Sequence, residues 1–480
     1  MVALYSILLA GGSGSRLWPM SREMFPKQMF KLDDEYTLFQ KTFLNLSNFV
    51  DDKNIITSTN VKYASQIKEQ LKHLQETFCR SYEYKVVSEP IFKNTAPAIA
   101  LAVKYIQDKV HYSTKEPVIF SIPADQLIAD RDGFSEIIEK GISLAQEGYI
   151  VSFGTETIYV NDNFGYIKCR KNSKISEIEK DALKVSNFVE KPTTKEAKAN
   201  LKGKFFINSG IYMFTPTVFF EELQKYSPEI YNSIFDKELQ KTIPSIALTD
   251  FEQMPNISID YALMEKTKKL VMLPLNTEWK DIGSWDAMYE ISPKDENGNC
   301  FIGETIDIGS KNSMVYSTSK LIATLGLEDT IVVETEDAIL VSDRKNEKGV
   351  KNIYKKLNGK NSVTREIHKT VYRPWGYYTV LENGNGFLTK CITVNPDAKL
   401  SVQLHHHRSE HWIILEGEAT ILKGEEFVKL QAGESIDIAV EEIHSLQNYG
   451  SEQLKVLEIQ QGDILDENDI ERLEDIYGRA

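Results

Sequence analysis

LLAGGSGSRLWPMSREMFPKQMFK, residues 8–31, is the stretch that decides the fold of this 480-residue chain. It overlaps the end of a short apolar run, residues 2–9, which predicts a buried first strand. Gly11, Gly12 and Gly14 remove side chains where a backbone bends sharply and approaches a ligand. A run of exposed N–H groups in such a loop can hold phosphate oxygens. The stretch therefore predicts a phosphate-binding loop directly behind a core strand.

Basic side chains follow these glycines closely. The same stretch contains Arg16, Arg22, Lys27 and Lys31. Four cations beside a glycine loop suit a polyanionic ligand such as a nucleoside triphosphate. The loop does not end in the Gly-Lys-Ser/Thr of a Walker A loop, and Pro19 interrupts the helix that a dinucleotide fingerprint would open. The sequence therefore indicates another kind of phosphate loop.

Composition and charge narrow the class of protein. The chain has 56 basic and 70 acidic residues, a formal net charge of −14, so it lacks the global basic field expected of a nucleic-acid partner. No run approaches the ~18–20 apolar residues of a membrane helix, and the N-terminus lacks the basic region of a signal peptide. Four cysteines without C-x-x-C spacing predict reduced, mostly buried thiols. We expect a cytoplasmic protein without a membrane or nucleic-acid partner.

The pattern of expected strands and helices changes twice along the chain. Residues 1–290 alternate strands and helices, which predicts an α/β domain whose mainly parallel sheet is covered on both faces. Residues 291–365 predict a β-rich connector and linker, and residues 366–480 an all-β barrel or sandwich. The acidic segment 466–477 carries an apolar stripe that predicts a terminal helix. The α/β part is expected to hold strands at 54–58, 84–88, 117–122 and 150–154, and helices at 61–74, 95–108 and 134–146.

Two carboxylates stand at places where a metal is useful. Asp125 follows the apolar strand PVIFSI, and Asp281 lies in EWKDIGSW. Ligands of such sheets bind beyond the carboxyl ends of the strands. Mg²⁺ prefers hard oxygen ligands, typically one or two carboxylates together with substrate phosphates. Either residue alone is more often a strand-end cap or a solvated acid.

The glycine stretch resembles the GGxGxRLxP signature of sugar-nucleotide pyrophosphorylases. The longer form GGSGSRLWPMSRxxxPKQ, with Trp18 and residues 26–28, is similar to the mannose-1-phosphate guanylyltransferase branch. The resemblance implies a Rossmann-like nucleotidyltransferase domain in residues 1–290, with Asp125 and Asp281 holding Mg²⁺. Gln126 departs from the His that often follows the first Asp in that family.

The resemblance also assigns substrate roles. Glu190 and Lys191 of NFVEKP, Asn208 of INSGIYMF and Gly165 of FGYI are implied to bind the sugar phosphate. Arg16 and Lys27 are implied to bind the triphosphate of GTP, and Lys191 the phosphate of mannose 1-phosphate. The nucleotide-binding residues expected from this pattern are Leu9, Ala10, Gly11, Gly12, Gly14, Ser15, Arg16 and Lys27. The sugar phosphate oxygen attacks the α-phosphorus and pyrophosphate leaves, so no protein nucleophile is needed.

A second constellation lies in the all-β part. Residues 403–411 read QLHHHRSEH, and His444 follows a hairpin or so later. Residues two apart in a strand share a face, so Gln403 and His405 point the same way. Together with Glu410 and His444 they make a set of nitrogen and oxygen ligands that suits Zn²⁺, Mn²⁺, Fe²⁺ or Co²⁺.

These spacings resemble the cupin metal motifs, and Gln403 in place of the first His resembles phosphomannose isomerases of type II. The resemblance implies that Gln403, His405, Glu410 and His444 hold a divalent transition metal (Zn²⁺, Co²⁺ or Mn²⁺), and that Arg408 contacts the substrate phosphate or the enediolate. The second motif usually reads P-x-G-x-x-H. Here Ala439 and Glu441 replace Pro and Gly, which puts the turn before His444 in question. His406, His407 and His411 are expected to face outward or to support the site; the sequence names no base.

Together the two resemblances imply a bifunctional enzyme of sugar-nucleotide and polysaccharide synthesis. Its first domain would make GDP-mannose and pyrophosphate from GTP and mannose 1-phosphate. Its cupin would interconvert mannose 6-phosphate and fructose 6-phosphate. The alternative is a guanylyltransferase whose cupin is structural or regulatory; a non-enzymatic sensor fits less well, because both carboxylates and the basic loop are intact. Partners are then small-molecule substrates, and homo-oligomerisation is left open.

Overall fold

The computed structural model divides into two compact units. The first comprises residues 1–317, 321–333 and 340–356, and the second residues 318–320, 334–339 and 357–480. The residues that the structure describes are 2–12, 14–31, 35–81, 83–109, 115–128, 131–157, 164–170, 181–193, 205–235, 251–275, 279–357, 362–465 and 467–476. Ser13 of the glycine stretch lies outside them.

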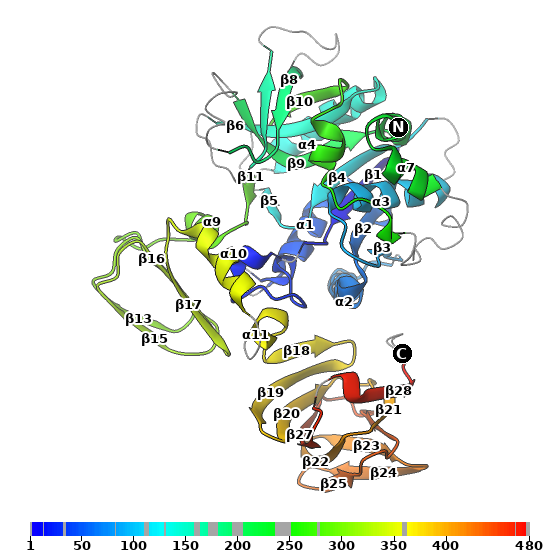
Figure 1. The fold of residues 1–480 in the computed structure, drawn as a ribbon, viewed down its shortest axis with the longest axis vertical. Helices are drawn as coiled ribbons and strands as arrows, with labels where there is room; N and C mark the ends of the chain where they lie inside the picture. The colour runs from blue at the N-terminus through cyan, green and yellow to red at the C-terminus, as the bar shows by residue number, and fades with distance from the viewer. Residues whose placement is uncertain are drawn as a thin grey trace. The chain divides into compact units, whose positions relative to one another are not determined.

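A nine-stranded sheet forms the centre of the first unit. Its strand order is β3-β2-β1-β4-β9-β6-β10-β8-β7 (Figure 1). The strands are β1 (Leu4–Leu9), β2 (Ile55–Asn60), β3 (Lys85–Glu89), β4 (Val118–Pro123), β6 (Ile150–Thr157), β7 (Tyr166–Cys169), β8 (Leu183–Val189), β9 (Phe205–Phe214) and β10 (Leu270–Pro274). β1, β2, β3 and β4 are parallel neighbours, and β6 pairs parallel with β10. β9 runs antiparallel between β4 and β6, an inversion that the βαβ rhythm did not predict.

Helices cover both faces of this sheet because its strands are apolar on both sides. Ile7 belongs to one buried cluster, with α3, α6 and α7, while its neighbour Leu8 belongs to the other, with α1, α2 and α4. The helices are α1 (Leu38–Leu46), α2 (Val61–Thr77), α3 (Thr95–Lys109), α4 (Arg131–Gln146), α6 (Pro216–Tyr226), α7 (Pro228–Phe235) and α9 (Trp285–Ile291). A short antiparallel pair, β5 (Gln126–Ile128) and β11 (Trp279–Asp281), places Asp281 opposite Gln126. The expected core strand at the N-terminus is confirmed.

The connector is a coil of short strands. They are β12 (Cys300–Ile302), β13 (Thr305–Ile308), β14 (Met314–Ser317), β15 (Ile322–Leu325), β16 (Thr330–Thr335) and β17 (Ala338–Asp343). β12 pairs parallel with β14, and β13 with β15. Helix α10 (Glu347–Lys356) follows the coil and lies beside η1 (Ser15–Leu17) of the glycine stretch (Figure 1). The first unit therefore continues past its sheet into this coil and helix.

The second unit encloses a core between two sheets, of order β18-β19-β20-β27-β22-β25 and β24-β23-β26-β21-β28. The short helix α11 (Val363–Glu366) precedes them. The strands are β18 (Thr370–Arg373), β19 (Gly376–Gly384), β20 (Phe387–Val394), β21 (Val402–His405), β22 (Arg408–Glu416), β23 (Glu418–Lys423), β24 (Glu426–Gln431), β25 (Ser435–Ile438), β26 (His444–Gln447), β27 (Leu454–Gly462) and β28 (Ile470–Glu474). Trp412, Leu446 and Val456 lie in the core between the sheets. The expected all-β barrel is confirmed.

The terminal helix expected over residues 466–477 is wrong. After a single 3-10 turn (Glu467–Asp469), the chain forms strand β28, which pairs with β21 so that Arg472 lies opposite Gln403. The apolar spacing is compatible with either element, and pairing with an open sheet edge decides for the strand. Residues 466 and 477 of the expected helix lie outside the described residues.

The structure also bears on two other expectations, the burial of the cysteines and the membrane helix. The four cysteines are free thiols, but only Cys300 is buried, and Cys79 is exposed, so the expectation of mostly buried thiols is wrong. Within the described ranges no helix has both the length and the apolar character needed to cross a membrane.

Gly376 supports the first prediction, a test of the second unit. Its φ is +143°, and an added Cβ would lie 2.0 Å from the Thr393 carbonyl oxygen of the paired strand. We expect Gly376→Ala to lower the unfolding free energy of this unit by more than about 2 kcal/mol, measured by chemical denaturation. Gly433→Ala is the control, because Gly433 has a positive φ of +90° but open space around it. Equal effects of the two substitutions would contradict the predicted clash.

Candidate functional site

The glycine loop lies at the carboxyl ends of the parallel strands, as its sequence predicts. The Leu9 carbonyl accepts a hydrogen bond of 2.9 Å from the Ala124 N–H, which ties the loop to the end of β4. Gly14 has a φ of +65°, and a Cβ there would come within 2.6 Å of the Lys27 Cβ. Only a glycine lets the loop turn this closely over the Lys27 side chain.

Lys27 joins the two carboxylates that the sequence singled out. Its Nζ lies 2.5 Å from an Asp125 oxygen and 3.3 Å from an Asp281 oxygen. Burial raises the pKa of Asp125, and the charge of Asp281 adds to this while Lys27 opposes it. Burial also disfavours the charged form of Lys27, but the two carboxylates hold its pKa above the usual range. The structure thus brings three predicted residues together, because the buried ammonium group of Lys27 contacts the carboxylates of both Asp125 and Asp281.

This arrangement fits a divalent cation. Two carboxylates within 3.3 Å of one positively charged atom are close enough to share an ion in its place. Their oxygens are the hard ligands that Mg²⁺ prefers, and each side chain stays about a quarter exposed, which leaves access for water or phosphate.

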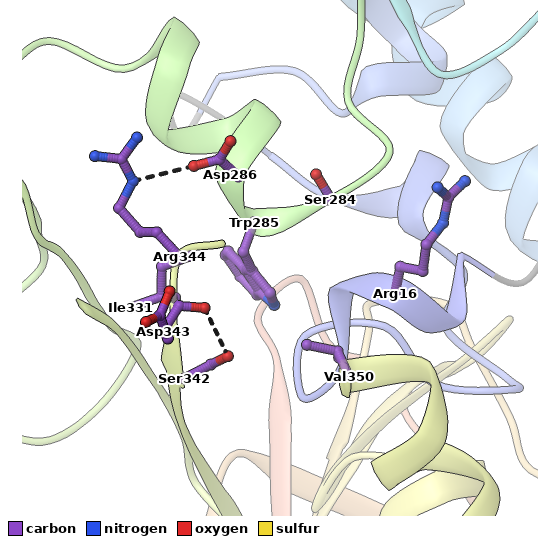
Figure 2. A pocket seen from close by; sticks show the side chains of 9 residues that line it. All are labelled: Arg16, Ser284, Trp285, Asp286, Ile331, Ser342, Asp343, Arg344 and Val350. Atoms are coloured by element: carbon purple, nitrogen blue, oxygen red, sulfur yellow. Dashed lines mark hydrogen bonds and ion pairs between the residues drawn. The ribbon is translucent and has the colours of Figure 1, made fainter. Parts of the chain in front are cut away.

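The loop that carries Asp281 is held from two sides. The Trp285 indole N–H donates to the Trp18 carbonyl at 3.0 Å, and Lys27 donates to the Ile282 carbonyl at 3.3 Å. From the connector, the Arg344 guanidinium pairs with Asp286 at 3.0 Å (Figure 2). Arg344 also covers the Tyr289 ring, 3.6 Å from its centroid. Figure 2 shows Trp285 between Arg344 and Arg16, and all three side chains line the same pocket.

The basic residues of the opening stretch do not all converge. Arg16 lies on η1 with an Nη atom 3.5 Å from the position of a Cβ on Gly283, beside the Asp281 loop. Arg22 is wholly buried and packs over the Trp18 ring, and Lys31 is exposed. Of the four cations expected at one ligand, only Arg16 and Lys27 therefore lie beside the Asp281 loop.

The predicted sugar residues form a connected group. Asn208 donates its backbone N–H to the Gly165 carbonyl at 2.9 Å, and Lys191 lies 2.8 Å from Glu190. Burial raises the pKa of Glu190, and Asp260 adds to the effect. Asp260 was missed by the sequence analysis: it accepts from the Asn208 amide at 3.1 Å and from Tyr212 at 2.5 Å. Its signal, an acid in ISIDYALM, is not distinctive.

A second missed residue is Glu89, the last residue of β3. It is buried, its Oε2 has no hydrogen-bond partner among the described residues, and its Oε1 lies 3.7 Å from the position of a Cβ on Gly11. Burial raises its pKa to about 8. A pocket of about 380 Å³ opens beside it, lined by Gly11, Phe92 and, from α10, Tyr354. An acid at the end of the third parallel strand was the available signal.

In the second unit the predicted metal ligands come together. One ligand atom from each of His405, Glu410 and His444 lies within 4.8 Å of the others, and all three side chains are buried. His405 Nε2 is 3.1 Å and His444 Nε2 3.7 Å from the Glu410 carboxylate. Burial disfavours the Glu410 anion, but the two imidazoles and Arg408 hold its pKa well below the usual range.

The far nitrogens of both rings are oriented by the backbone. His405 Nδ1 lies 3.1 Å from the Asp469 carbonyl, and His444 Nδ1 lies 2.8 Å from the Glu442 carbonyl. Each Nδ1 is therefore a donor to the backbone, and each Nε2 is the atom turned toward the cluster. His444 Nε2 is buried without a hydrogen-bond partner among the described residues. Two oriented imidazoles and a carboxylate fit a divalent transition metal.

Gln403 and Arg408 complete this cluster. The Gln403 amide nitrogen lies 3.5 Å from His405 Nε2, while its oxygen accepts from Ser401; rotating the amide turns the oxygen toward the cluster. The buried Arg408 guanidinium donates to Glu410 at 3.2 Å. All five residues that the sequence assigned here are therefore within one site.

At the turn before His444, Glu441 stands where the family pattern has a glycine. Glu441 takes a φ of +62°, the conformation a glycine prefers, and its N–H donates to the His405 carbonyl at 2.7 Å. His406 and His411 pair with the acids Glu471 and Asp437 away from the cluster, and His407 is exposed.

Comparison with known proteins assigns three parts of the chain to families. Residues 5–298 match the nucleotidyl transferase family, residues 303–357 the MannoseP isomerase/GMP-like beta-helix domain, and residues 360–475 the mannose-6-phosphate isomerase C-terminal domain. A mannose-1-phosphate guanylyltransferase of Escherichia coli K12 is 36% identical over 99% of both chains. The alginate biosynthesis protein AlgA of Pseudomonas putida is 36% identical over 99% of this chain and 96% of its own.

A solved structure has the same fold over much of the chain. It is described as a mannose-1-phosphate geranyltransferase from Thermus thermophilus, with a TM-score of 0.63 and 24% identity. The alignment covers 75% of this chain and 100% of that one.

Lys27 generates the second prediction. Removing its charge leaves Asp125 and Asp281 facing each other, so we expect Lys27→Met to lower the unfolding free energy by about 1–2 kcal/mol in a chelator. Because Mg²⁺ can replace the lost charge, millimolar Mg²⁺ should recover most of that loss in the variant, and it should raise the unfolding free energy of the wild type by less. Denaturation with and without Mg²⁺ measures this. An Mg²⁺ response equal to that of the wild type would contradict the shared cation position.

Proposed function

Since the chain belongs to the nucleotidyl transferase family and to the mannose-1-phosphate guanylyltransferases with a C-terminal mannose-6-phosphate isomerase domain, we propose that it carries two activities. The first makes GDP-mannose and pyrophosphate from GTP and mannose 1-phosphate. The second interconverts mannose 6-phosphate and fructose 6-phosphate. The observation that carries the first is the pair Asp125 and Asp281 around Lys27 at the glycine loop.

The transferase works by position and charge. The loop N–H groups and Arg16 bind the triphosphate, while Lys27 offsets the charge of the phosphates. Glu190 and Asn208 hold the sugar, and Lys191 holds its phosphate close to the α-phosphorus, so that the phosphate oxygen attacks in line with the departing pyrophosphate. When bound between Asp125 and Asp281, Mg²⁺ supplies the charge that neutralises the reacting phosphates.

Glu89 supports the choice of guanine. A carboxylate accepts hydrogen bonds, and guanine offers two adjacent donors, N1–H and the N2 amino group, where adenine offers only one amino group. Glu89 lies next to the pocket at Gly11, because its Oε1 is 3.7 Å from the position of a Cβ on Gly11, which lines the pocket. We assign Glu89 to base recognition, with Phe92 and Tyr354 as walls of the base pocket.

The isomerase rests on the cluster of His405, Glu410 and His444, with Gln403 as fourth ligand. When bound there, a divalent transition metal supplies the Lewis acidity that stabilises the negative charge developing on the sugar oxygens. Arg408 adds a fixed positive charge beside the same oxygens. The cluster is buried and its histidines are oriented in advance, which favours an active site over the alternative of a purely structural cupin.

The third prediction separates the two activities. Asp281→Asn removes a metal-binding charge, so we expect GDP-mannose synthesis to fall at least 100-fold while isomerisation is unchanged. Dialysis of wild-type protein against a chelator should abolish both activities. Adding back Mg²⁺ alone should restore the transferase, and adding Zn²⁺, Co²⁺ or Mn²⁺ as well should restore the isomerase. Coupled assays on mannose 1-phosphate with GTP, and on mannose 6-phosphate, measure the two rates.

The proposed transferase and the proposed isomerase can each be contradicted independently. A folded Asp281→Asn variant with normal turnover would overturn the magnesium site. Isomerisation that persists without any metal would overturn the cupin assignment. A protein that never isomerises with any metal would leave the guanylyltransferase with a structural cupin.

Glu89 gives the fourth prediction. Its pKa of about 8 in the folded protein is above its unfolded value, so the stability it contributes is full below about pH 4.5 and is lost as pH rises through 8. Between pH 5 and 9 we expect the unfolding free energy of the wild type to fall by up to about 4 kcal/mol more than that of Glu89→Gln. Denaturation at each pH measures this difference.

The same variant tests base recognition. Glu89→Gln keeps one acceptor oxygen but puts an NH₂ donor in place of the other, so the preference for GTP over ATP in kcat/KM should drop at least tenfold. An unchanged preference would remove Glu89 from the base site. The isomerase rate is the internal control, since Glu89 belongs to the other unit.

A further inference from the structure

An unassigned buried acid lies close to the cupin metal ligands. Glu458 of β27 is 4% exposed, and in the sheet it lies opposite Trp412 on β22 and Lys390 on β20. Two residues further along the same face, Gln460 lies opposite Glu410. The Gln460 amide donates to Glu410 at 3.0 Å and to Glu458 at 2.8 Å. A single amide therefore separates Glu458 from the metal ligand Glu410.

Glu458 faces a cavity that also reaches the ligand side. The cavity measures about 50 Å³, and Gln403, Arg408 and Glu410 line it together with Glu458. Its other lining residues include three cations and an acid: Arg373, Lys390, Arg472 and Glu467. The cavity thus has a metal-ligand end and a basic end, with Glu458 on its wall.

The basic end suits a phosphate. Arg373 and Arg472 share Glu467, at 3.4 Å and 3.0 Å, and Lys390 lies 3.6 Å from Glu458. Three cations against these two acids leave a net positive charge. Arg472 Nε is buried without a hydrogen-bond partner among the described residues, so it has a donor to offer.

We propose that Glu458 is the carboxylate that moves the proton between C2 and C1 of the sugar phosphate, while Arg373, Lys390 and Arg472 bind the 6-phosphate. This inference rests on the isomerase half of the proposed function. Of the other acids on the cavity wall, Glu410 is occupied as a metal ligand and Glu467 by two arginines. The histidines His406 and His411 pair with acids away from the cluster.

The surroundings of Glu458 suit a group that both takes and returns a proton. Burial raises its pKa to about 7, and the charge of Glu410 adds to this, while Lys390, Arg408 and His405 oppose it. At neutral pH both the carboxylate and the acid form are therefore populated, as general acid–base catalysis requires.

The step balances within the substrate. In open-chain mannose 6-phosphate the C2–H bond breaks, its proton passes to Glu458, and its electron pair forms the C1=C2 double bond as O1 takes up the negative charge. The O2 proton then moves to O1. The double bond returns its electron pair to C1, which takes the proton back from Glu458, and O2 becomes the carbonyl of fructose 6-phosphate. No oxidant or external proton is consumed.

Glu458→Gln in the full-length, metal-loaded protein is the fifth prediction. We expect isomerase kcat to fall at least 100-fold, with KM and the affinity for mannitol 6-phosphate within about threefold of wild type. Incorporation of deuterium from D₂O into the sugar should fall with kcat. The control is Glu416→Gln, since Glu416 is an exposed acid on β22 that pairs with Lys455 at 2.8 Å. The transferase rate and the bound transition-metal content should stay unchanged in both variants.

A kcat within tenfold of wild type in Glu458→Gln overturns the proposal. If that variant loses its metal or fails to fold, Lys390→Met decides instead. Because Lys390 lowers the pKa of Glu458, its loss should move the acid limb of the kcat profile to higher pH, and an unmoved limb overturns the proposal. A wild-type protein without isomerase activity or deuterium exchange overturns the isomerase function and this assignment together. Normal isomerisation and exchange in the wild type, with an unaffected Glu458→Gln, overturns only the role of Glu458.

Discussion

Attraction between one buried cation and two carboxylates organises the transferase site. Asp281 is 254 residues from Lys27 in the chain, and Asp125 ends a different strand, yet all three meet at one point. Carboxylates placed this close repel each other, so the site needs a positive charge at its centre. The cupin has a similar arrangement, in which the Arg408 guanidinium lies beside Glu410 and the two imidazoles. In both units a positively charged side chain pairs with the carboxylates that we expect to bind metal.

The supports of each site come from segments far away in the sequence. Arg344 of the connector pairs with Asp286, next to the loop that carries Asp281, and Trp285 joins that loop to Trp18. In the cupin, the carbonyls of Asp469 and Glu442 fix the two histidine rings. Contacts from distant segments of the chain therefore add to the central charges in fixing the positions of the site residues.

Sequence reasoning located the residues whose types are diagnostic. Glycines, a Lys-Gln after Pro26, strand-end acids and clustered histidines carry local signals that survive without a structure. It missed Glu89, Asp260 and Glu458, because a single acid in an apolar segment resembles many solvated acids until its neighbours are known. It also made β28 a helix, since strand pairing with β21 is a long-range contact that no local period encodes. The antiparallel insertion of β9 was missed for the same reason.

Tyr354 shows where the transferase ends. It lies on α10, beyond the whole coil of short strands that follows α9, yet it lines the pocket beside Gly11. The sheet and its helices have their own hydrophobic clusters, so a shorter polypeptide stopping after α9 retains a complete core. Such a fragment lacks Tyr354, which lines the pocket beside Gly11, and it lacks the ion pair between Arg344 and Asp286. The residues that form the core around the sheet therefore end earlier in the chain than the residues that line the pocket beside Gly11.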